Sequence, residues 1–416
     1  MFFSSSNPRF RIYTTPSSYA SVAKDVLTGN VRSGDDCSVL EMHVSETVGA
    51  QYALCMPKAR VGIFLAVSQL VRKGGKIILS PYTLSDVINM VLCAGAIPVF
   101  ADIDRDTCNI DPDQIEKLVD DETDAVLITH LHGYSCDMDR IVKICRKNNL
   151  SLIEDAAQAF GAKFKGKQVG TFGDAGIFSF GMYKHVNSFF GGMLVTSNDN
   201  VYKSIRSKME VFPWQETGYF LKKMLIGLAS DIATYPPLFK SLTYWIFSYA
   251  YLHDIEFLNR KVKVDLDPKS KTVLPESYLR RMTPMQARVI ENQLPVVNDN
   301  IEKRIEAAEV YHEGLKDIEE LVLPPMLSDG SHIYTHYPLQ APDREALIKY
   351  MIRNGRDVAV QHLRNCADLD CFKSFFRDCP EARKAADQNI LLSTYPRYGL
   401  EQVEENVRVI RGYFGK

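Results

Sequence analysis

Short apolar runs alternate with amphipathic segments through the first half of the chain, and this alternation restricts the fold more than any other feature. The amphipathic segments, at 86–95, from 112 and at 141–147, have helical spacing. The apolar runs lie at 76–81, 97–104, 125–133 and 150–153. Such long connections suit parallel strands joined by helices, so the chain is predicted to be an α/β protein with a mostly parallel sheet flanked by helices.

The run at 150–153 ends in two acids, Glu154 and Asp155. In open α/β sheets, ligands bind at the carboxyl ends of the strands, so an acid is expected at the site. Two further β-type runs follow at 175–180 and 191–196, and Lys184 lies in the connection between them. The sequence therefore places an acid and a lysine at neighbouring strand ends.

Pyridoxal 5'-phosphate (PLP) requires such a pair. Its aldehyde forms a Schiff base with a lysine amine, and an acid keeps its ring nitrogen protonated. Ser179 is a candidate phosphate contact, because hydroxyls and backbone N–H groups solvate a dianion. The alternative is that neither residue has a chemical role, with Asp155 capping a helix and Lys184 lying on a solvated loop.

A second candidate site follows the short strand YALCM (52–56), where a helix begins near residues 58–60. A helix N-terminus after a strand is an anion site, and the backbone amides of Ala59 and Arg60 are available there. The Arg60 guanidinium could also bind phosphate. The alternative is that Arg60 is a surface helix residue.

Composition excludes several other classes. The formal charge of −2 gives no indication of a nucleic-acid or anionic-membrane partner. The N-terminus lacks a sustained apolar core, so no signal peptide is predicted, and nine scattered cysteines indicate reduced thiols and a cytoplasmic protein. His130 and His132 would share one face of a strand, but no acid or cysteine cluster completes a metal site, and zinc is not expected.

Several stretches, in order along the chain, resemble the DegT/DnrJ/EryC1/StrS aminotransferase family. The strongest is IEDAAQAFGAKFKGKQVGTFGDAGIFSF, followed by Lys184 and later by Gly191 and Gly192. Residues 73–112, 127–141, 280–294 and the segment from Tyr334 onward also resemble the family's landmarks. The similarity covers the chain from about residue 38 to its end.

The resemblance implies PLP fold type I, with a large domain and a smaller C-terminal α/β domain. We divide the chain into an N-terminal arm (1–37), a PLP-binding large domain (38–208), a helical aromatic-rich insertion (209–270), and a linking helix with the small domain (271–416). The linking helix is expected from Thr283 to Leu315, and one strand of the small domain is expected at 358–363. The resemblance also implies a homodimer with active sites at the subunit interface. Its activity would be amino transfer, most often from glutamate, to a keto-sugar that is plausibly nucleotide-linked.

By the same resemblance, Lys184 forms the Schiff base, Asp155 faces the ring nitrogen, and Gln158 contacts the ring hydroxyl or the substrate. Some positions depart from the family pattern. Lys58, Ala59 and Arg60 replace a Ser-Gly-Thr turn that binds the phosphate, and Leu84 replaces an aromatic residue or histidine that stacks on the ring.

Two further departures lie nearer the substrate. Phe190 replaces a frequent glutamate, which suggests either a changed pocket wall or a buried pair with Phe189. Leu279 replaces an asparagine that reaches the partner's phosphate. These changes leave the substrate open.

Residues 209–267 differ most from the family, and they are predicted to form two helices with broad apolar faces. These helices could pack on the parent domain or a second copy, which we favour, cover a large substrate, or lie in a membrane interface. Two other functions remain open. One is a PLP-dependent sugar dehydratase, although Lys184 stands where such enzymes have histidine. The other is a catalytically silent PLP-binding, regulatory or membrane-associated protein.

Overall fold

A computed structural model describes residues 6–12, 14–255, 257, 267–360 and 363–416. Its centre is a seven-stranded sheet in the order β1-β10-β9-β6-β5-β2-β4. β10 runs antiparallel to both of its neighbours, and the remaining neighbours are parallel. The strands are β1 (Tyr52–Met56), β2 (Lys76–Leu79), β4 (Ile97–Phe100), β5 (Thr123–Thr129), β6 (Ser151–Asp155), β9 (Ala175–Ser179) and β10 (Gly192–Thr196). The predicted α/β class is confirmed.

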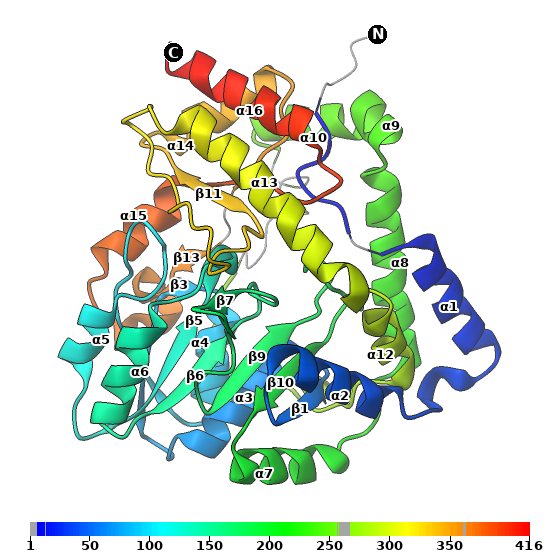
Figure 1. Cartoon of the computed structure of the whole chain (residues 1–416), viewed down its shortest axis with the longest axis vertical. Helices are drawn as coiled ribbons and strands as arrows, with labels where there is room; N and C mark the ends of the chain where they lie inside the picture. The colour runs from blue at the N-terminus through cyan, green and yellow to red at the C-terminus, as the bar shows by residue number, and fades with distance from the viewer. Residues whose placement is uncertain (1–5, 13, 256, 258–266, 361–362) are drawn as a thin grey trace.

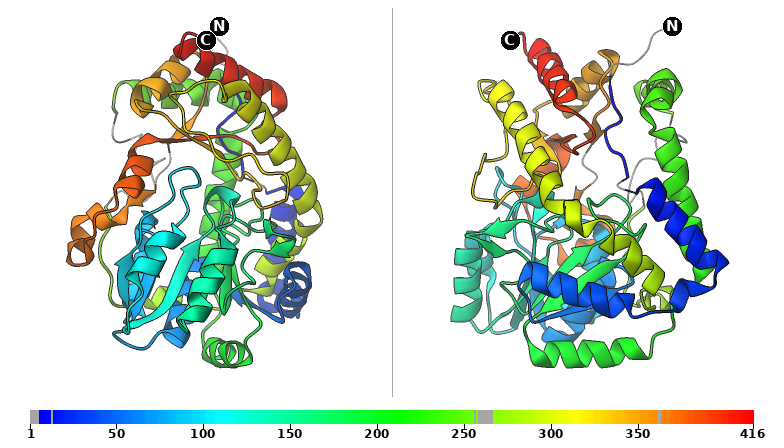
Figure 2. Two further views of the ribbon diagram at one scale, coloured as in Figure 1. Left: turned by 60° about the vertical axis from the view of Figure 1, so that its left-hand side comes forward. Right: turned by 45° about the vertical axis from the view of Figure 1, so that its right-hand side comes forward.

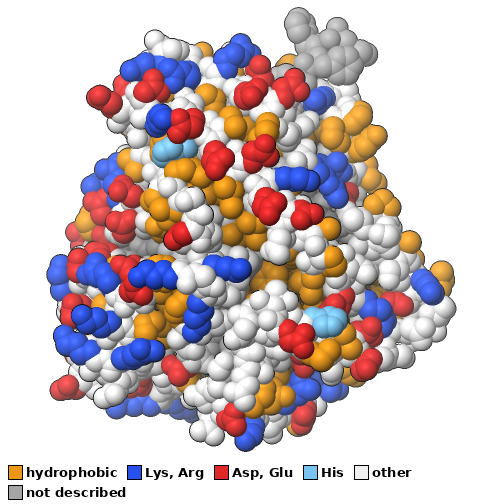
Figure 3. Space-filling view, viewed as in Figure 1, with side chains coloured by type: hydrophobic (Ala, Val, Ile, Leu, Met, Phe, Trp, Pro, Cys, Tyr) orange, Lys and Arg blue, Asp and Glu red, His pale blue; other side chains and the backbone are white. Residues whose placement is uncertain are grey.

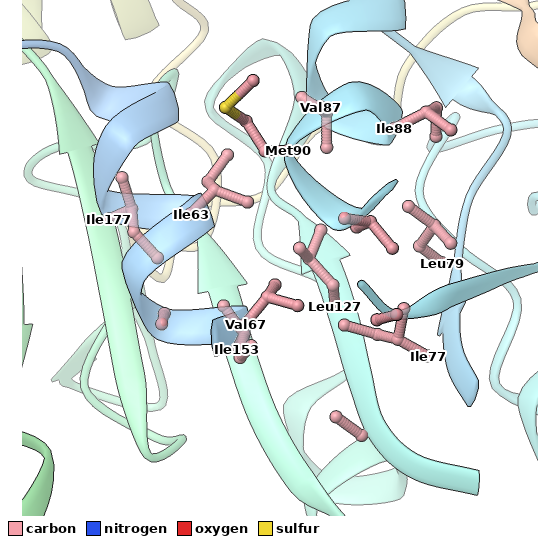
Figure 4. Packing of buried hydrophobic residues seen from close by; sticks show 14 of the residues in the cluster. Ile63, Val67, Ile77, Leu79, Val87, Ile88, Met90, Leu127, Ile153 and Ile177 are labelled. Atoms are coloured by element: carbon pink, nitrogen blue, oxygen red, sulfur yellow. The ribbon is translucent and has the colours of Figure 1, made fainter. Parts of the chain in front are cut away.

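Helices cover both faces of this sheet (Figure 1). On one face pack α3 (Ala59–Leu70), α4 (Ser85–Cys93) and α7 (Asp199–Glu210). Figure 4 shows Ile63 and Val67 of α3 against Ile153 and Ile177 of the strands. On the other face pack α2 (Asp36–Val48), α5 (Pro112–Leu118) and α6 (Met138–Lys147). Two-sided burial explains why these strands read as continuous apolar runs.

A second, three-stranded sheet lies in the C-terminal part and has the order β11-β14-β12. Its strands are β11 (Tyr337–Gln340), β12 (Ala359–Val360) and β14 (Asn389–Leu392). Against it pack α14 (Arg344–Arg353) and α16 (Leu400–Tyr413). The short turns η6 (Cys366–Asp368) and η7 (Asp370–Phe375) and the helix α15 (Pro380–Gln388) pack on the core of the seven-stranded sheet. The strand expected at 358–363 lies partly outside the described residues. Two short strands, β3 (Tyr82–Thr83) and β13 (Arg364–Asn365), pair and join this part to the first.

The helix expected from Thr283 to Leu315 is wrong as a single element. The structure has α12 (Pro284–Glu291), the turn η5 (Leu294–Val296) and α13 (Val297–Leu315). Pro295 causes the break, because proline has no N–H to donate and its ring clashes with the preceding turn. The interruption changes the direction of the chain between the two parts (Figures 1 and 2).

The N-terminal segment runs along the C-terminal part before reaching α1 (Pro16–Leu27) and η1 (Asn30–Arg32). The Asn7 N–H donates to Gln402 at 2.9 Å, and the Arg9 N–H donates to Asp357 at 2.8 Å. Within the seven-stranded part lie η2 (Leu131–Gly133) and a small hairpin of β7 (Lys163–Phe164) and β8 (Lys167–Gln168).

The aromatic-rich insertion begins with α8 (Thr217–Ala233), which lies beside α1 at one edge of the molecule (Figure 2). It continues through α9 (Pro236–Leu238) and the π-turn η3 (Phe239–Thr243) into α10 (Tyr244–Leu252), and η4 (Glu276–Tyr278) follows later. In the part of the insertion that the structure describes, two main helices are therefore present, as predicted. Among the described residues, no helix combines the length and the apolar character needed to cross a bilayer.

Candidate active site

The carboxyl end of β6 carries two acids on opposite faces of the sheet, because successive side chains of a strand alternate. Ile153 packs in the core beneath α3 and α4, whereas Leu152 packs in the core on the other side. Asp155 therefore lies on the α3 side and Glu154 on the opposite side.

Asp155 is 5% exposed, and its Oδ1 accepts a hydrogen bond from the Ala157 N–H at 3.0 Å. Burial raises the pKa of its carboxyl group, while the bond from Ala157 and the nearby Lys184 and His130 oppose that effect. Because its pKa is raised, the Asp155 carboxylate can share a proton with a cationic group beside it.

Lys184 lies in the turn between β9 and β10, where its backbone N–H donates to the Gly181 carbonyl at 2.9 Å. Burial lowers the pKa of its amine, and Asp155 partly opposes this. A lowered pKa increases the unprotonated, nucleophilic fraction of an amine at neutral pH. The structure thus brings the two residues singled out from the sequence into one electrostatic environment.

A narrow space lies beside this pair, where the N-terminus of α3 meets the ends of β9 and β10. It is bounded by Ala59, Arg60, Ser179 and Gly192 and is here termed the cradle. A Cβ atom on Gly192 would be 2.7 Å from the Ala59 nitrogen, so glycine is required for this close approach. Ser179 is the strand partner of Gly192. The N–H groups of Ala59 and Arg60 belong to the first helical turn, which has no partners within the helix. Two amides and a hydroxyl suit the phosphate of PLP.

The Arg60 side chain is engaged elsewhere. Its Nη1 pairs with Asp86, which also binds the Lys271 amine at 2.8 Å, and it lies 3.4 Å from the Tyr278 hydroxyl. At this position, the backbone N–H rather than the guanidinium is available to an anion.

Lys58 has an environment that the sequence did not indicate. Its amine lies 4.0 Å from the ring centroid of Tyr278 and 5.5 Å from that of Tyr219. Burial, then Arg60 and Lys223, lower the pKa of this amine to about 8. Cations are therefore concentrated next to the cradle, which favours a dianion there.

Leu84 and Gln158 lie just after β3 and β6, respectively. Leu84 is the N-cap residue of α4 and packs against the core cluster of the α3 side. The Gln158 Oε1 accepts a hydrogen bond from the His132 N–H at 3.0 Å. The amide oxygen of Gln158 is therefore already bonded to η2.

Phe189 and Phe190 are a buried structural pair, the second of the two interpretations. The ring of Phe190 lies 5.0 Å from that of Tyr219 and 5.8 Å from that of Phe220. Phe189 has φ of 68° and contacts Phe220 and Tyr19. The two rings anchor α8 to the turn that carries Lys184. Leu279 directly follows η4, and its N–H donates to Glu276 at 3.0 Å.

Glu154 is a site residue whose role the sequence did not reveal. It is fully buried, and its two oxygens accept N–H groups from Gly170, Phe172 and Gly173, each at 2.7 Å. It also contacts His130. The carboxylate therefore fixes the segment between β6 and β9. The closely spaced glycines after a strand-end acid were the one available signal.

His130 and His132 do not share a strand face, contrary to expectation. His130 follows β5, while His132 lies in η2 with φ of 56°, and burial lowers its pKa to about 4. Among the described residues, no group of three or more His, Cys, Asp or Glu is arranged to hold a metal ion.

Two histidines, His185 and His336, lie near Lys184. Burial lowers the pKa of both His185 and His336 to about 3, and the Arg304 charge adds to this effect. Arg304 is 3% exposed and donates to the Thr335 carbonyl at 2.8 Å. The Arg304 guanidinium is therefore held inside the protein, close to His185 and His336.

Comparison with known proteins adds to this geometry. The model of the DegT/DnrJ/EryC1/StrS aminotransferase family matches residues 16–229 and 262–411. The chain is 28% identical to the spore coat polysaccharide biosynthesis protein SpsC of Bacillus subtilis, covering 94% of this chain and 92% of the relative. It is 36% identical to GDP-perosamine synthase of Escherichia coli O157:H7 over 170 residues, which is 41% of this chain and 47% of that one.

It is also 29% identical to an uncharacterized protein of Methanocaldococcus jannaschii, covering 70% of this chain and 65% of the relative's length. Two solved structures have the same fold. The aminotransferase PseC of Helicobacter pylori has a TM-score of 0.76 at 20% identity and covers both chains completely. The GDP-4-keto-6-deoxy-D-mannose-3-dehydratase of E. coli has a TM-score of 0.76 at 19% identity, covering 97% of this chain and 99% of the other.

Proposed function

Since the chain belongs to the DegT/DnrJ/EryC1/StrS aminotransferase family, we propose that it uses PLP to transfer an amino group from glutamate to a keto-sugar. The observation that carries this proposal is the pairing of Asp155 with Lys184 beside the cradle formed by Ala59, Gly192 and Ser179. The cradle is narrow, rich in N–H donors and surrounded by cations, so it fits a phosphate group. The acid and the amine fit the two ends of the PLP ring.

When bound, PLP supplies an aldehyde that captures amines and a ring that withdraws electrons from the carbon next to the nitrogen. Lys184 would hold the aldehyde, and its amine, whose pKa is lowered, would carry a proton between donor and acceptor positions. Asp155 would keep a proton on the ring nitrogen. The N–H groups of Ala59 and Arg60 and the hydroxyl of Ser179 would bind the phosphate.

The substrate assignment rests on the relatives. One is named for spore coat polysaccharide biosynthesis and another for the synthesis of GDP-perosamine. Both names concern sugars, and the second concerns a nucleotide-linked one. A nucleotide-linked keto-sugar is therefore the acceptor we propose. We propose further that a second copy of the chain completes the site, as the family resemblance implies.

A dehydratase is the alternative with the same fold. His185 is next to Lys184, but its ring is buried and its pKa is lowered to about 3, so it is a poor acid at neutral pH. Lys184, and not a histidine, is the residue whose side chain interacts with Asp155. This arrangement favours amino transfer.

The test is titration of the purified protein with PLP, followed by absorbance, beside Lys184→Ala and Lys184→Arg. A visible band that is lost in both variants, and that glutamate bleaches in the wild type, supports the proposal. Transfer of ¹⁵N from glutamate to a panel of nucleotide-linked keto-sugars then identifies the acceptor. Absence of the band would refute a PLP function, and loss of a sugar hydroxyl without nitrogen transfer would indicate dehydration.

A further inference from the structure

The insertion presents an extended apolar surface at the edge of the molecule. Its members are large hydrophobic side chains that are more than a third exposed. They are Leu225, Ile226, Leu228, Ile232, Tyr235, Leu242, Trp245, Ile246 and Tyr249, here termed the α8–α10 surface. Figure 3 shows hydrophobic side chains on the part of this edge that faces the viewer, at the upper right near α8 and α9. Exposed apolar patches of this kind mark interaction sites.

α8 is apolar on both of its faces. On the inner face Phe220 packs between Phe189 and Phe190, and Gly227 allows Phe189 to approach closely. On the outer face Leu225 is 57% exposed and Ile232, two turns later, is 55% exposed. A helix between a protein core and water has a polar outer face. The outer face of α8 therefore has the composition of a buried surface.

α10 repeats this arrangement. Its inner side is fixed by Tyr244, whose hydroxyl donates to the Ile352 carbonyl at 2.5 Å, and by Tyr251, which donates to Glu345 at 2.8 Å. Its outer side carries Trp245, 43% exposed, and Tyr249, 60% exposed. Tryptophan and tyrosine are enriched where proteins meet the headgroup region of a membrane.

The charge on these elements is one-sided. Residues 217–252 contain three lysines, at 222, 223 and 240, and a single acid, Asp231. Asp231 is turned inward, where it accepts a hydrogen bond from the Tyr19 hydroxyl at 2.7 Å. Arg11 and Arg397 also lie near it. Lys223 lies near Tyr219 and Lys58 beside the cradle, so Lys222 and Lys240 are the basic groups that remain for this surface, within a chain of net charge −2. Basic charge complements anionic lipid headgroups.

We propose that the α8–α10 surface binds the interfacial region of an anionic lipid bilayer. The aliphatic side chains of α8 would enter the boundary between headgroups and acyl chains, and Trp245 and Tyr249 would lie at headgroup level. α8 lies on the membrane and does not cross it, because its inner face is occupied by Phe189 and Phe190. A second copy would not need lysines around an aliphatic centre, which is why lipid is the occupant we choose. The proposal is independent of the amino-transfer function.

The test is flotation of the full-length protein with vesicles of phosphatidylcholine alone and with added phosphatidylglycerol. We expect binding to the anionic vesicles that weakens with salt. Leu225→Glu combined with Ile232→Glu should reduce the partition coefficient at least tenfold, as expected when roughly two buried aliphatic side chains are lost. The matched control is Phe376→Glu, an equally exposed position away from this surface, which should bind as wild type.

A second measurement does not depend on charged variants. The chain has two tryptophans, so Trp214→Phe leaves Trp245 as the single tryptophan, whose emission can be excited selectively. Brominated lipids should then quench its fluorescence. The proposal is overturned if the wild type does not float, if the double variant floats equally well, or if Trp245 is not quenched. It is also overturned if light scattering shows that the double variant dissociates a wild-type dimer, because a second copy would then cover this surface.

Discussion

His130 and Glu154 form a hydrogen-bonded pair with no exposed surface, in which Nε2 of the ring lies 3.1 Å from Oε2 of the carboxylate. The Nδ1 atom of the same ring accepts the Cys136 N–H at 3.0 Å, so the proton of a neutral ring must be on Nε2. The imidazole therefore donates to the carboxylate. This bond ties the end of β5 to the end of β6, directly behind Asp155.

The first prediction concerns Glu154. Glu154→Ala should lower the free energy of unfolding by about 3–5 kcal/mol, because three backbone N–H groups and the His130 ring would lose their buried acceptor. Urea denaturation measures this. The control is Glu404→Ala, which is exposed on α16 and should change stability little. Equal stability of the two variants would show that Glu154 does not organise the loop.

The second prediction concerns Asp155. Asp155→Asn keeps the shape but removes the charge that raises the pKa of Lys184, so that pKa should fall further. The limb of the pH–rate profile that reports Lys184 should move to lower pH, and kcat should fall about 100- to 1,000-fold. Steady-state kinetics across pH checks both effects. An unchanged profile would mean that the two side chains do not act together.

The third prediction concerns the Lys58 amine, whose pKa is lowered to about 8. Its neutral, reactive fraction rises as pH increases through about 8, so acylation followed by mass spectrometry should show a midpoint there. Lys76 is the control, because Asp120 and Glu122 raise its pKa and delay its reaction. Bound PLP should protect Lys58, since a phosphate beside it would favour the charged amine. Equal reactivity of both lysines would contradict this prediction.

The fourth prediction concerns Gly192. Gly192→Ala would place a methyl group 2.7 Å from the Ala59 nitrogen and 2.9 Å from the Phe178 carbonyl oxygen. It should weaken PLP binding and cost about 1–3 kcal/mol of stability through overpacking. Gly218→Ala, at a position with no atom within 4 Å, is the matched control. PLP titration and thermal unfolding of both variants test the cradle.

The fifth prediction concerns Phe190, which is 7% exposed among Tyr219 and Phe220. Introducing the glutamate that is frequent in the family, as Phe190→Glu, should destabilise the protein by about 3–5 kcal/mol, because the aromatic packing is lost and a carboxyl group is buried. Phe190→Leu should cost less. Chemical denaturation of the pair separates packing from charge. If Phe190→Glu were tolerated, the aromatic anchor of α8 would be unnecessary.

The strand that ends at Asp155 could be predicted from the sequence, because a buried strand needs an apolar run and a strand-end acid interrupts it visibly. Lys184 and the helix beginning at Ala59 could be placed for similar local reasons. The proposed roles of Asp155 and Lys184 towards PLP then follow from the chemistry of a carboxylate and an amine. The segment 283–315 shows the limit even for local signals, because its helical pattern continues past Pro295 whereas the chain forms two helices there.

The partners of each side chain depend on contacts between distant segments, and only the tertiary structure decided them. The Arg60 guanidinium pairs with Asp86 and is therefore not free for a phosphate. Phe190 packs against Phe220 of α8, and Glu154 accepts N–H groups of the loop at 170–173. The outer face of α8 illustrates the same point. Its apolar residues are evident in the sequence, but which of them are exposed depends on where Phe189 and α1 pack. The hydrophobic pattern alone does not determine this packing.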